Sequence, residues 1–239
     1  MVSFEILLVL GTLGFYLYDS GMLLYVNEMV FFRERRQWNF ACPGNSWLLL
    51  GRSPYIPNPL TPEIAMFRVY WSDTGRSSQN SDESIEQFVA ALVPLQYLVD
   101  VLLAQFFIAL PFVLFLYGSG PQLLWVFGAI YLNIAVILVV VYKKKDILKV
   151  SKRKFVALSF ESIACAPFAL NIVRKLTLHR SLVGDPIEFA KIMFDQNVFL
   201  DLIAVISKRI DEQLEMVEID TPRYASLQAY KMTIEEMNK

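Results

Sequence analysis

The sequence predicts a mainly α-helical, polytopic membrane protein with three transmembrane helices, a small cytoplasmic β-hairpin insert and a helical cytoplasmic C-terminal domain. Apolar residues make up 55% of the chain and charged residues only 19%, whereas soluble domains carry about 25% charged residues. Three apolar runs reach the ~20 residues that a helix needs to cross a bilayer core. Lysine and arginine collect at the ends of these runs, as membrane flanks do.

The two strongest apolar runs are Phe88–Tyr117 and Gln122–Tyr142, and only four residues separate them. They predict a transmembrane helical hairpin closed by a tight turn. The first of the two is longer than a straight crossing needs, so we expect tilt or a kink to absorb the excess. Pro94 and Pro111 each remove an intrahelical hydrogen bond and mark the places where the helix can kink.

The first run predicts a retained membrane helix over Phe4–Tyr25, with an interfacial stretch up to Phe32. It lacks the positive start and the small-residue cleavage site of a signal peptide. With three spans, the basic clusters after the first and third runs fall on one side of the membrane, which the positive-inside rule makes cytoplasmic. The N-terminus is then outside. The interfacial cations are Arg33, Arg35, Arg36, Lys143, Lys144, Lys145, Lys152, Arg153 and Lys154.

The predicted organisation is consecutive along the chain: residues 1–32 form the first span and its interface, 33–85 the insert, 86–142 the helical hairpin and 143–239 the C-terminal domain. In the insert, Phe67, Val69 and Trp71 occupy alternate positions, which is the period of a strand. We expect Trp47–Leu50 to pair with that strand. An isolated hairpin is marginal in water, so we expect a docking surface formed by Trp38, Trp47, Tyr55, Phe67 and Trp71.

The region after residue 143 contains one more apolar run, Phe155–Val173, which Glu161 and Pro167 interrupt and which has cations at both ends. Flanking cations favour a segment that lies in the cytoplasmic leaflet or re-enters it, and a fourth span is the alternative. Farther on, one apolar stripe predicts an amphipathic helix. Its residues are Leu200, Ile203, Ile206, Ile210 and Leu214.

A candidate polar cluster lies within the predicted spans and comprises Asp19, Gln96, Asp100, Gln105 and Asn133. An ionised carboxylate at the centre of a membrane helix costs about 2.5–3.5 kcal/mol on insertion scales. Since no lysine or arginine lies inside a predicted span, the aspartates need a proton, water or another subunit. Either the cluster holds helices together through hydrogen bonds, which we favour, or it is an ion or lipid-headgroup site.

Other function classes have weaker support in the sequence. No nucleophile elbow, phosphate loop or metal-spaced His/Glu pair is present, so we expect no enzyme, no metal and no cofactor apart from bound phospholipid. The lone histidine, His179, cannot by itself make a zinc site. The basic clusters flank membrane segments, so we expect no nucleic-acid partner.

Tyr18-Asp19-Ser20, Asn27-Glu28 and the stretch Gly51–Leu60 resemble uncharacterised proteobacterial inner-membrane proteins. The group they resemble includes the trimeric envelope-homeostasis protein of Acinetobacter. The resemblance covers mainly the first 70 residues and transfers no functional residue. It implies a multi-pass protein of the bacterial inner membrane that works as a homotrimer in envelope lipid balance.

The sequence thus favours a non-enzymatic homo-oligomeric scaffold in envelope maintenance, with membrane lipids as partners. One alternative is a proton- or cation-conducting subunit that uses the intramembrane carboxylates. Another is an accessory subunit that binds other membrane proteins through the docking hairpin.

Overall fold

The structure is a computed structural model that describes residues 4–34, 37–42, 49–71, 82–118, 120–178, 180, 182 and 186–237. Arg35, Arg36, Trp47 and His179, which the sequence analysis singled out, lie outside these residues. The chain forms two compact units. The helical unit comprises Met1–Met22, Ile56–Ala65 and Ser81–His179, and the sheet unit comprises Leu23–Tyr55, Met66–Asn80 and Arg180–Lys239. Each unit therefore joins segments that are far apart in the sequence.

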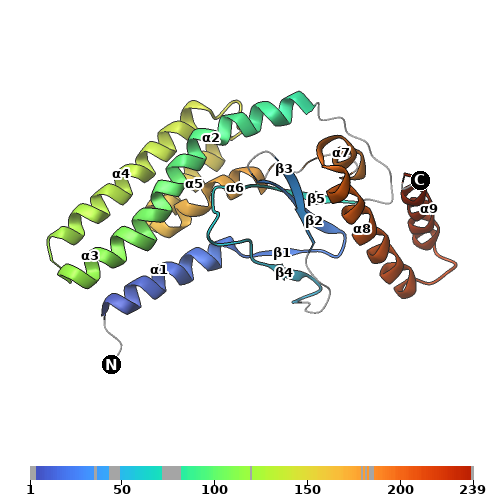
Figure 1. The fold of residues 1–239 in the computed structure, drawn as a ribbon, viewed down its shortest axis with the longest axis horizontal. Coiled ribbons are helices and arrows are strands. Elements are labelled where there is room, and N and C mark those ends of the chain that lie inside the picture. The colour runs from blue at the N-terminus through green and yellow to red at the C-terminus, as the bar shows by residue number, and fades with distance from the viewer. Residues whose placement is uncertain are drawn as a thin grey trace. The chain divides into compact units, whose positions relative to one another are not determined.

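The helical unit is built around one long helical stretch that turns back on itself (Figure 1). This stretch runs through α2 (Asp82–Ala104), a π-helical turn η1 (Gln105–Ala109) and α3 (Leu110–Tyr117), and returns as α4 (Gln122–Lys143). Within the described residues, two helical stretches are long and apolar enough to cross a membrane, Ile85–Tyr117 and Gln122–Lys143. The structure contains the predicted pair of long apolar helices joined by a tight turn. The turn uses Gly118 at φ 60°, a left-handed conformation that glycine adopts without strain.

The expected kink in the first arm of the hairpin takes the form of the π-helical turn just before Pro111. Leu110 donates its backbone N–H to the carbonyl of Gln105, five residues back. Pro111 has no N–H, and its ring would collide with the carbonyl four residues back in a regular α-helix. The wider turn moves that carbonyl away. Pro94, by contrast, lies inside α2, which runs on past it.

The first helix, α1 (Phe4–Ser20), is shorter than predicted. It ends five residues before Tyr25, because Asp19, Ser20 and Gly21 are poor helix formers and the chain then enters strand β1 (Met22–Leu24). Its 17 residues span about 25 Å at 1.5 Å per residue, which is less than a bilayer core of about 30 Å. The interfacial stretch expected after it is strand β2 (Glu28–Glu34) instead.

The fourth apolar run is broken rather than continuous. It forms α5 (Lys152–Ala164), a 3-10 helix η2 (Ala166–Asn171) and α6 (Ile172–Leu178). The break falls at Cys165-Ala166-Pro167, where proline cannot continue the preceding hydrogen-bond ladder. α5 alone has 13 residues, or about 20 Å, too few to cross a bilayer core.

The sheet unit contains two small sheets. Strands β3 (Gln37–Ala41), β2 and β5 (Ala65–Tyr70) form one sheet in the order β3-β2-β5, and β1 pairs with β4 (Ser53–Tyr55) in the other. The strand predicted at Met66–Trp71 is confirmed, and Phe67, Val69 and Trp71 are buried as its period requires. Its predicted pairing is wrong: β5 pairs with β2, while Leu49 and Leu50 lie in a turn closed by the Leu49–Arg52 bridge.

Three helices complete the sheet unit: α7 (Pro186–Met193), α8 (Gln196–Met216) and α9 (Pro222–Met237). The predicted amphipathic stripe is confirmed at its centre, where Ile203, Ile206 and Ile210 of α8 are buried. The core of this unit is aromatic. Phe31 of β2 stacks on Phe189 with ring centroids 5.8 Å apart and meets Phe194 at 4.8 Å.

Candidate functional site

The predicted intramembrane cluster separates into three polar groups, all in the helical unit. The first joins the two arms of the hairpin. Asn133 of α4 donates from Nδ2 to Oε1 of Gln105 at 3.2 Å and to the carbonyl of Leu98 at 3.1 Å. Asn133 is buried, and the Leu98 carbonyl lies in α2, about two turns before the π-helical turn. This pair therefore links the two arms of the hairpin by hydrogen bonds within one chain.

The second group contains Gln96 and Asp100, which share one face of α2 at i and i+4. Gln96 donates from Nε2 to the backbone carbonyl of Glu63 at 3.0 Å. The carboxyl of Asp100 is in hydrogen-bonding contact with the carboxyl of Glu63. Two ionised carboxylates can only accept hydrogen bonds, so this contact needs a proton on one of them.

Burial favours that protonated form at Glu63. Burial raises the pKa of the Glu63 carboxyl above its ordinary value, and the neighbouring carboxyl of Asp100 raises it further, against a lowering by the backbone N–H of Glu63 and a smaller lowering by Arg174. Oε2 of Glu63 is shielded from solvent and, among the described residues, accepts no hydrogen bond from a donor. The protonated form of Glu63 is thus favoured beside Asp100, between the segment 56–65 and α2.

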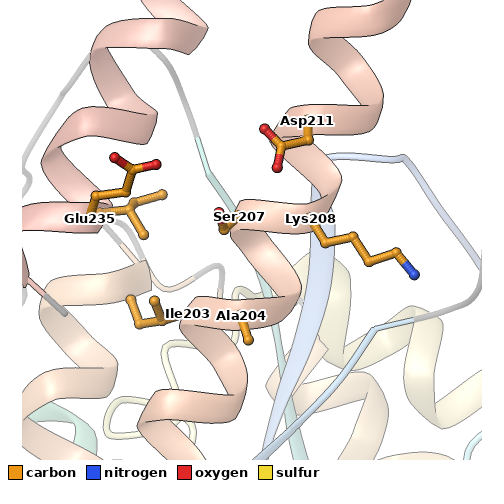
Figure 2. Close-up of a pocket in the computed structure, with 7 residues that line it drawn as sticks. Ile203, Ala204, Ser207, Lys208, Asp211 and Glu235 are labelled. Atoms are coloured by element: carbon orange, nitrogen blue, oxygen red, sulfur yellow. The ribbon is translucent and has the colours of Figure 1, made fainter.

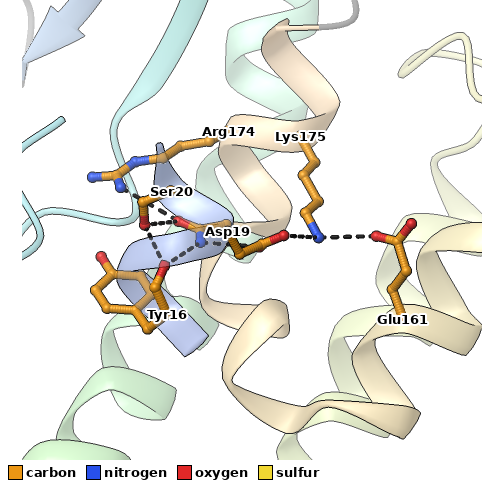
Figure 3. Close-up of polar contacts among 7 residues, drawn as sticks. Tyr16, Asp19, Ser20, Glu161, Arg174 and Lys175 are labelled. Atoms are coloured by element: carbon orange, nitrogen blue, oxygen red, sulfur yellow. Dashed lines mark hydrogen bonds and ion pairs between the residues drawn. The ribbon is translucent and has the colours of Figure 1, made fainter. Parts of the chain in front are cut away.

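The third group surrounds Asp19 at the end of α1 (Figure 3). Lys175 of α6 places Nζ 2.8 Å from Oδ1 of Asp19 and 2.9 Å from Oε2 of Glu161, and it also lies 4.9 Å from the ring of Phe168. Asn171 donates to Oδ2 of Asp19 at 3.0 Å. The expectation that no cation is available to Asp19 is wrong, because the broken fourth run folds back and supplies Lys175.

Arg174 is the most buried charged side chain of the helical unit, with 2% of its surface exposed. It donates to the backbone carbonyls of Asn58 at 2.6 Å and Thr61 at 2.8 Å, and to Oδ1 of Asn171 at 3.3 Å. These carbonyls belong to a proline-rich segment of turns, in which they also accept hydrogen bonds from the N–H groups of Thr61 and Ile64. Arg174 therefore fastens the segment 56–65 to α6, as its planar fork of donors allows.

Tyr16 and Ser20 connect α1 to the segment 56–65 and to Asn171. The hydroxyl of Tyr16 donates to the carbonyl of Pro59 at 2.6 Å, and Ser20 donates to Oδ1 of Asn171 at 3.0 Å. Both residues are buried. Three sequence-distant segments, around residues 16–20, 58–63 and 171–175, thus meet in one preorganised polar centre, part of which is drawn in Figure 3.

The predicted interfacial cations differ in their exposure and in their contacts. Lys144 donates from Nζ to the carbonyl of Ala91 at 3.0 Å, and Lys145 lies 4.9 Å from the ring of Tyr142. Lys143, Lys152 and Arg153 are exposed, and burial lowers the pKa of Lys154. Arg33 lies in β2, 5.9 Å from the ring of Trp38. The cations at the end of α4 and the start of α5 therefore form a mostly exposed basic rim, as the membrane interpretation expects.

The predicted docking hairpin does not offer the surface that was expected of it. Trp38, Phe67 and Trp71 are 4%, 0% and 2% exposed, because they form the core of the sheet unit. Trp38 packs against Phe67 and Phe189 with ring centroids 5.6 and 5.2 Å apart. Tyr55 is half-buried. Their aromatic composition reflects a core rather than an interface.

The sheet unit contains a pocket of about 360 Å³ between α8 and α9 (Figure 2). Ile203, Ala204, Ser207, Lys208, Asp211, Ile234 and Glu235 line it. Its carboxylates are already paired, since Lys231 lies 2.6 Å from Asp211 and 3.9 Å from Glu235, and Lys208 extends away from them. No group of three or more metal-ligating side chains occurs among the described residues. This pocket offers no converging set of groups for a ligand.

Sequence reasoning missed Glu63, Asn171, Arg174 and Lys175. In the sequence, Arg174 and Lys175 have the pattern of a membrane flank, because a flank and a buried partner look alike there. One signal was available: the four prolines between residues 54 and 62 leave carbonyls that need outside donors.

A pH dependence follows from the Glu63–Asp100 contact. A carboxyl whose pKa is higher in the folded than in the unfolded state binds more protons when folded, so stability falls as pH rises. We expect the melting temperature in mild detergent to fall as pH rises from the ordinary glutamate pKa through the raised value. Glu63→Gln should flatten that part of the curve, and the exposed Glu188→Gln should leave it unchanged. A flat wild-type curve would contradict the shared proton.

No protein-family model matches this chain, and neither a curated protein nor a solved structure matches it, so the functional proposal rests on the residues themselves.

Proposed function

We propose that this chain is a non-enzymatic, multi-pass membrane protein that acts as a homo-oligomeric scaffold in envelope maintenance and holds phospholipid along its helical hairpin. The sheet unit and its helices form its water-facing part. The N-terminus lies outside and the C-terminal helices lie in the cytoplasm of a bacterium.

The observation that carries this proposal is the apolar surface of the hairpin. Ile108, Leu124 and Leu132 expose 69%, 74% and 68% of their surfaces. Other large exposed apolar residues continue this surface: Val101, Phe112, Phe115, Leu116, Trp125, Val136 and Val139. A surface of this extent is unfavourable in water and typical of contact with lipid or another subunit.

Asp100 supports the oligomer, because it is exposed on α2 within this surface. Lipid cannot hydrate a carboxyl group, and Glu63 satisfies only part of it. A second copy of the hairpin is the simplest source of the remaining partners, since polar side chains commonly link membrane helices.

Native mass spectrometry of the protein in mild detergent tests the scaffold. We expect a homo-oligomer with retained phospholipid. Asp100→Leu should weaken the oligomer roughly three- to twenty-fold, because an interhelical hydrogen bond is worth about 0.6–1.7 kcal/mol. Asp146→Asn, an exposed aspartate in the turn after α4, is the matched control and should have no effect. A wild-type monomer that Asp100→Leu leaves equally stable would reject the scaffold.

A second candidate, a proton- or cation-conducting subunit, is favoured by the contact between Glu63 and Asp100. A pair of carboxyl groups that shares one proton can take it up from one side and release it to another. Reconstituted vesicles with a trapped pH-sensitive dye would test this. Wild-type flux that falls in both Glu63→Gln and Asp100→Asn supports conduction, and absence of wild-type flux excludes it.

A further inference from the structure

We propose that α5, η2 and α6 form a re-entrant segment that brings water and small cations from the basic rim to the ion-paired centre of Asp19, Glu161 and Lys175. The proposal rests on the membrane placement of the hairpin given above. It adds an aqueous path inside the bilayer that neither the apolar surface nor the oligomer requires.

The first step is the direction of α5. Near its start, the ring of Phe155 lies 5.4 Å from the ring of Tyr142, at the basic end of α4. Near its end, the hydroxyl of Tyr131 donates to the carbonyl of Ile163 at 3.4 Å. Tyr131 and Tyr142 are about three helical turns apart on α4, or roughly 16 Å. α5 therefore runs antiparallel along α4 instead of lying across its end.

The second step is depth. α4 has 22 residues, or about 33 Å, so Tyr131 lies near its middle. Asn133, which bonds to Gln105, marks the same level on the other arm of the hairpin. The end of α5 and the break at Cys165–Pro167 are thus about halfway down the hairpin. Irregular backbone at that depth is tolerated only where protein buries it or water reaches it.

The third step is the exposure of charge at this level. The side chain of Glu161 is 47% exposed, whereas Lys175 and Asp19 are 18% and 13% exposed. A half-exposed carboxylate cannot face hydrocarbon without a cost of several kcal/mol. On α5 it lies beside the exposed apolar residues Phe160 and Ile163. One side of α5 can therefore contact lipid, and the adjacent side, which carries Glu161, can contact water.

The charge of the centre selects what enters with the water. Among the charged groups at the centre, the Glu161 carboxylate is 47% exposed, whereas the cations Lys175 and Arg174 are 18% and 2% exposed. Entering water therefore meets a negative charge first, which attracts cations and repels anions. The basic rim at Lys152 and Arg153 lies at the other end of α5 and is screened there by bulk salt.

Cysteine accessibility in proteoliposomes of phosphatidylcholine and phosphatidylglycerol tests the aqueous path. In a Cys42→Ser, Cys165→Ala background, single cysteines replace Glu161, the exposed Ala164 and the lipid-facing Leu132. A cationic, water-soluble methanethiosulfonate is applied on both sides. Glu161→Cys and Ala164→Cys should react at least about tenfold faster than Leu132→Cys, since only a hydrated thiol ionises readily. Ala164→Cys keeps the charges of Asp19, Glu161 and Lys175, so it is the control for any structural change caused by the loss of Glu161.

The three patterns of labelling have different meanings. Fast reaction at positions 161 and 164 with slow reaction at 132 supports the path. Slow reaction at all three overturns the path and leaves the membrane placement intact. Fast reaction at all three overturns the membrane placement and the path with it. The anionic sulfonate analogue, compared with the cationic reagent at the exposed reference Ile219→Cys, should be disfavoured at position 164. Equal preference at both positions would contradict cation selectivity.

Discussion

Replacing Arg174 by leucine should lower the free energy of unfolding of the helical unit by at least about 3 kcal/mol, because each hydrogen bond from a charged donor is worth about 1.5–3 kcal/mol. Arg174 makes such bonds to the carbonyls of Asn58 and Thr61 and to Asn171. Without the guanidinium, the two carbonyls keep only their turn hydrogen bonds from the N–H groups of Thr61 and Ile64, and the segment 56–65 loses its attachment to α6. Unfolding in mixed detergent micelles, followed by circular dichroism, measures the loss.

Two further variants show whether geometry or charge matters at this position. Arg174→Lys keeps the charge but not the planar fork, so it should recover only part of the stability. Arg153→Leu removes an exposed arginine from α5 and should change stability by less than about 0.5 kcal/mol. If Arg174→Leu were as mild as Arg153→Leu, the polar centre would not hold the helical unit together.

Replacing Phe31 by alanine should lower the stability of the sheet unit by about 3–5 kcal/mol, the range for a buried phenylalanine. Phe31 is fully buried and packs on Phe189 and Phe194, so its removal leaves a cavity between β2 and the α7–α8 region. Trp38, 5.2 Å from Phe189, reports on the same core. Guanidinium unfolding followed by tryptophan fluorescence in a Trp125→Phe background measures the effect.

The control for Phe31 is Ile219→Ala, which truncates an apolar side chain that is 74% exposed and should change stability by less than about 0.5 kcal/mol. The helical content of the hairpin should survive Phe31→Ala. A parallel loss of the helical unit would mean that the two units do not unfold separately.

Much of the fold could be predicted from the sequence where a feature depends on neighbouring residues. The hairpin arms follow from uninterrupted apolar runs, the strand at Met66–Trp71 from its alternation, and the stripe of α8 from its spacing. The partner of β5 could not be predicted, because pairing with Glu28–Glu34 depends on a contact across about forty residues that no local pattern encodes. The early end of α1 depends likewise on where the following strand finds its sheet.

The candidate site shows the same division. Asn133 and Gln105 belong to the predicted cluster of five polar residues, which the structure divides into three groups. Asp19 and Asp100 were predicted to need partners, and Lys175 and Glu63 come from segments whose sequence indicates a membrane flank and part of the cytoplasmic insert. The positive-inside rule considers only where a charged residue lies along the chain. A residue at the end of an apolar run can nevertheless fold back into the interior of the protein.

The π-helical turn at Gln105–Ala109 affects how the first arm of the hairpin must be numbered. A π turn holds one more residue than an α turn, so every side chain after it is rotated by about 100° relative to an ideal helix. Leu110 and Leu114 are buried while Phe112 and Phe115 are exposed, and this pattern is out of phase with the buried positions before the turn. A helical wheel drawn over all 33 residues would therefore show the buried stripe of the second half displaced from that of the first. Anyone who transplants or shortens this helix should treat it as two helices with separate phases.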